Sequence, residues 1–284
     1  MKRRIIFTDQ SIVDFCTATK DTNEVHDPVF MESIGKRVIV PGMFAFACAA
    51  TLSADFLRTR AGRIRVFFNT LLSSGDFADL IAEPQPILPE TIRLSAINHK
   101  DTLASHEEYT FMQNHHESFV PQAEGIVLEL PVSQEQISAF ARLTGCADPD
   151  IHGFLFAVAY ASHALFERIA MAETEVEKEI DWLINGDGNV SPFYHMLEIF
   201  LPGEFVQVEA GNRIQYRIHF EREKLHRNYI ANLQCEQEGR IIYRSVYKLV
   251  GIPDPVNKPA APLYHSLVHQ SLIWFIKPDQ SEIK

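Results

Sequence analysis

The sequence has few cysteines, no long apolar run and no excess of basic residues, and each shortage excludes a class of protein. The 284 residues include four cysteines, none in a CxxC spacing: Cys16, Cys48, Cys146 and Cys235. So few cysteines exclude a disulfide scaffold and argue against a structural zinc site. We therefore expect a reducing, cytoplasmic location.

The apolar residues never run long enough to cross a membrane. The longest apolar run, Val38–Ala50, is interrupted by Pro41 and Gly42, whereas a spanning helix needs about 20 apolar residues. The basic start at residues 1–4 is followed by only three apolar residues, which is too short for a secretory leader. We expect neither a signal peptide nor a membrane partner.

The charge balance argues against nucleic acid as a partner. Lys and Arg number 26 against 37 Asp and Glu, a net charge of −11, and the basic residues form no stripe. The content of apolar residues, 46%, and of charged residues, 22%, is that of a globular protein. Domains of about 150 residues would give two domains, or one domain built twice.

An internal repeat favours one domain built twice. Residues 8–26 read TDQSIVDFCTATKDTNEVH and residues 133–152 read SQEQISAFARLTGCADPDIH. Matching positions recur in the same order: Ile12 with Ile137, Phe15 with Phe140, and His26 with His152. The order predicts a duplicated unit of about 125 residues.

Each unit shows the same order of predicted elements. A capped helix comes first, over 9–19 or 134–143, and a helix that is apolar on nearly every face follows, over 43–57 or 154–170. Runs typical of strands follow at 64–72, 77–82, 91–97, 108–112 and 125–130, and then at 193–199, 204–209, 214–220, 229–234 and 241–249. The pattern predicts an α+β fold with units at 1–131 and 132–252, then a proline-rich connector and helical extension at 253–284.

One loop of the first unit carries groups that could do chemistry. Asp21, Asn23 and His26 place a carboxylate, an amide and an imidazole within six residues; the alternative is that they simply form turns. Gly42 opens the buried helix 16 residues after His26, and its N–H lies at the positive end of the helix dipole. Such a donor can hold a thioester oxygen as negative charge develops. An acid–base pair beside it predicts chemistry alpha and beta to a carbonyl.

These residues resemble the MaoC-like hydratases and dehydratases, the (R)-specific enoyl-CoA hydratase group. The family motif is approximately G-D-x-N-P-x-H, followed by I-V-H-G-M at the start of the central helix. The matching residues here are Asp21, Asn23, His26, then Ile39-Val40-Pro41-Gly42-Met43, and a later pair, Gly75-Asp76. Lys20, Glu24 and Pro41 replace the usual Gly, Pro and His.

The resemblance implies a tandem hot-dog fold, in which each half wraps an antiparallel sheet around a central helix. It also implies a hydro-lyase of fatty acid or polyketide metabolism, acting on enoyl or 3-hydroxyacyl thioesters without metal or cofactor. Asp21 and His26 would hold one water, Asn23 would orient the loop or the water, and Gly42, flanked by Pro41 and Met43, would bind the thioester oxygen.

The substrate would be an acyl thioester of CoA or of acyl carrier protein, and a homo-oligomer is left open. Four arginines after the central helix form a candidate patch for the phosphates of CoA or for a carrier protein: Arg58, Arg60, Arg63 and Arg65. Two alternatives stay open, an acyl thioesterase on the same fold and a non-catalytic acyl-binding or scaffold subunit of a biosynthetic assembly.

The second unit departs further from the motif. Cys146 stands where the acid is expected, and the spacing to His152 is one residue longer. We therefore expect a degenerate second half that forms one wall of the acyl pocket. The alternative is that Asp148 or Asp150 supplies the acid.

Overall fold

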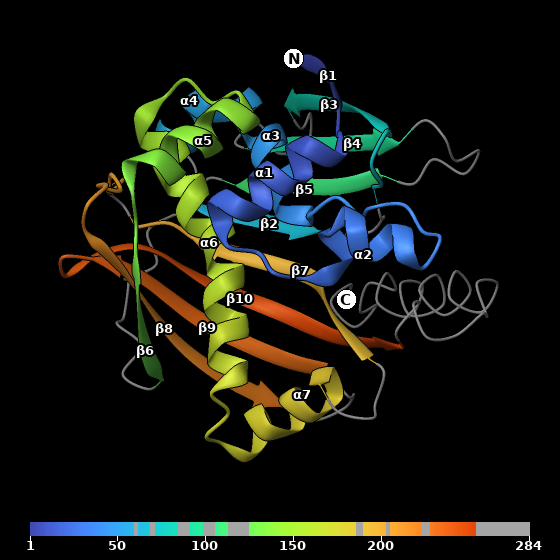
Figure 1. Cartoon of the computed structure of the whole chain (residues 1–284). Coiled ribbons are helices and arrows are strands. Elements are labelled where there is room, and N and C mark those ends of the chain that lie inside the picture. The colour runs from blue at the N-terminus through green and yellow to red at the C-terminus, as the bar shows by residue number, and fades with distance from the viewer. Residues whose placement is uncertain are drawn as a thin grey trace, which may run out of the picture.

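The computed structural model describes residues 1–59, 62–68, 72–84, 91–98, 106–112, 125–185, 190–202, 205–222 and 228–253 (Figure 1). Arg60 and the extension predicted beyond Pro253 lie outside these residues. The first half contains β1 (Lys2–Ile6), α1 (Asp9–Thr19), η1 (Glu24–His26), α2 (Pro28–Ser33), α3 (Gly42–Ala50), η2 (Thr51–Ser53), α4 (Ala54–Thr59), β2 (Arg63–Phe67), β3 (Phe77–Pro84), β4 (Thr91–Asn98) and β5 (His106–Met112). The second contains β6 (Ile126–Pro131), α5 (Gln134–Thr144), α6 (Pro149–Ala170), α7 (Glu175–Asn185), β7 (Val190–Phe200), β8 (Arg213–Arg222), β9 (Asn228–Gln237) and β10 (Arg240–Pro253).

All described strands form one antiparallel sheet in the order β1-β3-β4-β5-β2-β7-β10-β9-β8-β6. The order is symmetric about the β2–β7 pair, in which Arg63 lies opposite Phe200 and Phe67 opposite Met196. The predicted α+β tandem hot dog is confirmed.

The edge strands differ from the prediction. β6 pairs with β8, so strand pairing places it in the sheet of the second half, although residues 125–130 were assigned to the first unit. The first half instead takes β1 as its edge, which pairs with β3. The sequence KRRII of β1 lacks the apolar alternation of a half-buried strand, so the pattern did not indicate it.

The helices gather on one face of the sheet (Figure 1), and a chain of aromatic rings joins the two halves there. The ring of Phe15 in α1 stacks on Phe44 in α3, with centroids 4.5 Å apart. Phe140 in α5 lies 5.6 Å from Phe15 and 5.7 Å from Phe156 in α6. The repeated positions Phe15 and Phe140 therefore meet at the axis that relates the halves.

The first helices of the two halves begin and end alike. Thr8 and Ser133 each form a capping box, which satisfies the free N–H groups of the first turn. Both helices end in the left-handed conformation, at Lys20 with φ 53° and at Gly145 with φ 71°. Glycine adopts this conformation readily, whereas lysine does so at a steric cost.

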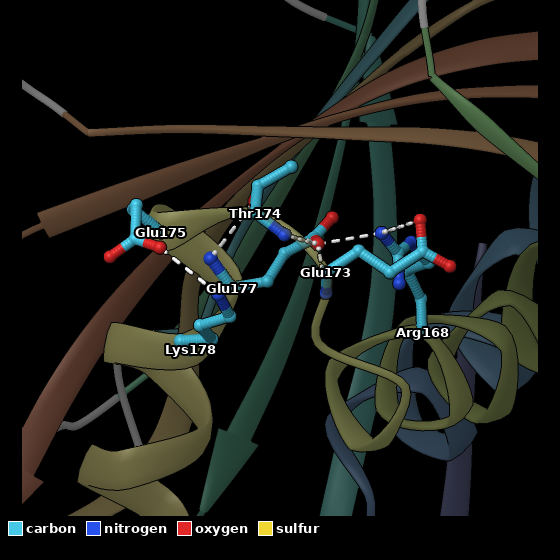
Figure 2. A network of polar contacts seen from close by, with 6 residues as sticks. All are labelled: Arg168, Glu173, Thr174, Glu175, Glu177 and Lys178. Atoms are coloured by element: carbon cyan, nitrogen blue, oxygen red, sulfur yellow. Dashed lines mark hydrogen bonds and ion pairs between the residues drawn. The ribbon is translucent and has the colours of Figure 1, made fainter.

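A buried ion pair fixes the corner between α6 and α7 (Figure 2). Arg168 is fully buried, and its guanidinium lies 2.6 Å from Oε2 of Glu177. The same oxygen accepts the backbone N–H groups of Glu173 and Thr174. Glu177 is therefore a core residue, although it belongs to a run of charged residues, 173–179, of the kind that usually forms a solvated helical face.

Among the described residues, no single helix is long and apolar enough to cross a membrane. α6 and residues 175–182 meet that test only together, as a pair bent by 102°. Most of α6 is buried inside the protein.

We predict that Lys20→Gly stabilises the protein. The change relieves about 1 kcal/mol of left-handed strain and gives up a cation–π contact worth about 0.5 kcal/mol. The free energy of unfolding in denaturant should therefore rise by roughly 0.5 kcal/mol. Gly145→Ala is the matched control and should lower it, because its Cβ would lie 2.7 Å from the Arg3 guanidinium at a positive φ. Lower stability of Lys20→Gly would contradict this account.

Candidate active site

The loop after α1 is shaped by its own side chains. The N–H of Asp21 donates to the carbonyl of Cys16, and the N–H of Asn23 donates to Oδ1 of Asp21 at 3.1 Å. Oδ1 of Asn23 accepts the N–H of Val25 at 3.3 Å and so caps η1. These contacts leave Oδ2 of Asp21 facing His26. In the structure Asn23 shapes the loop.

The Asp21 carboxylate and the His26 imidazole face each other. Nδ1 of His26 lies 2.7 Å from the carbonyl oxygen of Ile39, which can only accept, so Nδ1 carries a proton. In the neutral ring Nε2 then has the free lone pair, and it lies 3.8 Å from Oδ2 of Asp21. Each side chain is 11% exposed. This distance is too long for a direct hydrogen bond but suits a water molecule bound to both groups.

The segment that holds His26 leads directly into the start of α3. The N–H of Ile39 donates to the carbonyl of Val25, and the N–H of Val40 donates to that of Leu72. α3 begins three residues after Ile39, at Gly42, with Pro41 as the residue before it. The N–H groups of Gly42 and Met43 open the helix, so they have no acceptor within it. The structure therefore brings the predicted acid–base pair and the predicted oxyanion donor onto one connected segment.

Gly42 is also required by packing. A Cβ at this position would lie 2.6 Å from Cδ1 of Phe68, a distance at which one of the two residues must move. The side chain of Met43 is buried in the core. The glycine at the start of α3 therefore allows Phe68 to pack closely against it, whether or not its N–H also binds a ligand.

The second half lines the loop with two residues that the sequence analysis missed. Nζ of Lys20, next to Asp21 in the chain, lies 5.9 Å from the ring centroid of Tyr160 in α6. The Tyr160 ring stacks on His163 at 5.6 Å. Burial lowers the pKa of His163; the Glu167 and Asp21 carboxylates oppose this effect, and the Lys20 ammonium adds to it. Only the tertiary contact between halves places these residues here, so a single sequence carries no signal for them.

The predicted arginine patch does not form at this loop. On β2, Ile64 and Val66 are buried against the helices, so the alternating side chains of Arg63 and Arg65 extend from the opposite face of the sheet. There the Nε atoms of both arginines donate to Oε1 of Glu198, at 2.6 and 3.0 Å.

Arg58, the third described member of that patch, connects the two halves. Its guanidinium lies 3.3 Å from a carboxylate oxygen of Asp148 and 3.4 Å from one of Asp55. It is engaged by two carboxylates and lies near the loop of the second half.

The second half has a shorter loop and no counterpart of His26. Asp27 and Asp148 each cap the next helix and precede a proline. Asp27 follows Lys20 by seven positions, whereas Asp148 follows Gly145 by three, so four residues are missing. His152 lies in the first turns of α6, and its alignment with His26 is wrong.

The second half also lacks a free helix start at its glycine. α6 begins at Pro149 and runs through Gly153, so the N–H of Gly153 belongs to the helix interior. Oδ1 of Asp148 accepts the N–H groups of Asp150 and Ile151 as a cap. Burial raises the pKa of the Cys146 thiol, although a hydrogen bond to the Asp148 carbonyl opposes this. The facing Asp21–His26 pair and the free start of α3 occur together in the first half.

In the part of the chain that the structure describes, no three His, Cys, Asp or Glu side chains gather in a way that could hold a metal ion.

Comparison with known proteins supports the fold. No protein-family model and no curated protein sequence matches the chain. A solved MaoC-like dehydratase superposes with a TM-score of 0.53 at 11% identity, covering 87% of this chain and 97% of that one. A MaoC-like dehydratase from Phytophthora capsici superposes with a TM-score of 0.54 at 13% identity, covering 91% and 96%. At such identities the likeness shows the fold alone, and it spans both halves.

Proposed function

We propose that the protein is a hydro-lyase that adds water to enoyl thioesters or removes it from 3-hydroxyacyl thioesters. One observation carries the proposal: Nε2 of His26 lies 3.8 Å from Oδ2 of Asp21 and faces it. The segment that holds His26 leads into Gly42 at the start of α3. Solved dehydratases that share the fold support the same reaction class. The acyl group would be carried by CoA or by an acyl carrier protein.

In the hydration direction, one water is bound between Asp21 and His26. Nε2 of His26 takes a proton from this water as its oxygen attacks the β-carbon. Negative charge moves to the thioester oxygen, where the N–H of Gly42 and the dipole of α3 stabilise it. The proton taken by His26 is then delivered to the α-carbon, so the protein ends in its starting state. Dehydration follows the same steps in reverse.

The thioesterase alternative requires a carboxylate base near a central helix. Asp55 is 94% exposed and lies next to Arg58, and Glu167 is 46% exposed on α6. Neither carboxylate is buried beside a free helix start. The geometry therefore favours water addition at the β-carbon over attack on the carbonyl.

We predict that the protein removes the enoyl absorbance of crotonyl-CoA without releasing free thiol. Asp21→Asn should lower the rate by about 10²–10⁴, a loss as large as that of a general acid–base group, because the carboxylate holds the water beside Nε2 of His26. Thermal unfolding should be unchanged. Asp27→Asn is the matched control, because it keeps the cap of α2 and should keep activity. Release of free thiol would indicate a thioesterase. If the enoyl absorbance stayed and no thiol appeared, the protein would be a non-catalytic module. Either result, or an active Asp21→Asn variant, would refute the proposal.

The role of the Gly42 N–H can be separated from its packing. Both test variants carry Phe68→Val, which makes room for a Cβ at residue 42. With Gly42→Ala the N–H is kept, and with Gly42→Pro it is removed at a helix position that tolerates proline. We expect the proline variant to have a kcat about 10²–10³ below that of the alanine variant. Equal kcat values in two folded variants would exclude this N–H as the oxyanion donor.

A further inference from the structure

A pocket of about 580 Å³ lies between the two halves at the shortened loop of the second half. One wall is the break between α3 and α4, and the other is the loop between α5 and α6. The lining residues are Met1, Thr51, Leu52, Ser53, Ala54, Asp55, Phe56, Ala82, Gly145, Cys146, Ala147 and Asp148. Pockets of this volume hold small organic ligands.

The position of the pocket follows from the symmetry of the fold. In the first half, the loop after Lys20 lies beside Tyr160 of α6. In the second half, the loop after Gly145 lies beside residues 51–56, which continue α3. This second loop is four residues shorter and lacks η1. The pocket therefore occupies the place that corresponds to the candidate active site, with part of the loop removed.

The wall combines apolar surface with polar groups, two of which are carboxylates. Leu52, Phe56 and Ala147 are among its apolar members. Ser53 is 5% exposed, and its hydroxyl has no hydrogen-bond partner among the described residues. The hydroxyl oxygen itself has almost no exposed surface. A buried hydroxyl without a partner is costly, so a carbonyl oxygen that reached Ser53 from the pocket would meet an unused donor. Arg58 holds the two carboxylates of the wall, Asp55 and Asp148.

We propose that this pocket is a second, non-catalytic binding site for the acyl-thioester end of a ligand. The inference rests on the proposed function, because the ligand class is taken from the corresponding site in the first half. The Ser53 hydroxyl would donate to a carbonyl oxygen, and the apolar wall would receive a short alkyl chain. The site lacks an acid–base pair and a free helix start, so it binds the ligand without converting it.

The test counts binding sites with butyryl-CoA, which has no double bond to hydrate, by equilibrium dialysis on the full chain. The parent should bind two equivalents. Ala147→Trp fills the pocket from an exposed position and should bind one, with crotonyl-CoA turnover retained. Ala170→Trp is the matched control, because Ala170 is exposed at the far end of α6. It should bind two.

The outcomes separate this inference from the proposed function. One equivalent in the parent and in Ala147→Trp, with crotonyl-CoA hydrated, would overturn the second site and leave the hydratase standing. No binding and no hydration would overturn both. Two equivalents in Ala147→Trp would place the second ligand elsewhere and overturn the assignment to this pocket.

Ser53→Ala gives a readout that a purely structural role would not give. Removing an unpartnered buried hydroxyl should keep or raise the Tm of the free protein. The same change should lower the affinity for the second equivalent of butyryl-CoA by roughly fivefold, the usual effect of one hydrogen bond. An unchanged second affinity would refute the role of Ser53.

Discussion

The pairing of β2 with β7 is the interaction on which the rest of the structure depends. Without it, each half would expose the unpaired edge of a sheet, and such edges attract other chains. With it, the sheet is continuous across the halves, and Phe15 meets Phe140 on the helix side. The same pairing sets α6 beside the loop after α1, where Lys20 lies above Tyr160. The candidate site is therefore built on one half and completed by the other.

Two local differences separate the halves after their common start. The first half keeps a longer loop with Asp21 and His26, and its central helix begins at Gly42. In the second half Asp148 caps a continuous helix, and the N–H of Gly153 lies in the interior of that helix. A few residues of loop length thus decide whether a half presents a facing Asp–His pair next to a free helix start. The second half is left with a pocket at the corresponding place.

Much of this arrangement could be predicted from the sequence, where the physical cause is local. The repeat of Ile12 and Phe15 predicted a duplicated unit, and glycine after proline predicted the start of α3. The rest depends on tertiary contacts. The pattern could not show that Arg63 and Arg65 would extend from the face opposite the helices, or that Glu177 would pair with a buried Arg168. His152 was misaligned because the helix cap at Asp148, four residues before it, was not recognised.

The central claim is that one half carries the chemistry. The most direct test is a side-by-side measurement of kcat/KM for His26→Ala and His152→Ala on crotonyl-CoA, with folding checked by thermal unfolding. The account predicts a loss of about 10²–10⁴ for His26→Ala, because a general base is removed. For His152→Ala it predicts a change of less than about threefold, since this half-buried side chain of α6 takes no part in the proposed proton transfers. An equal or larger loss for His152→Ala would contradict it and assign the active half to the C-terminal unit.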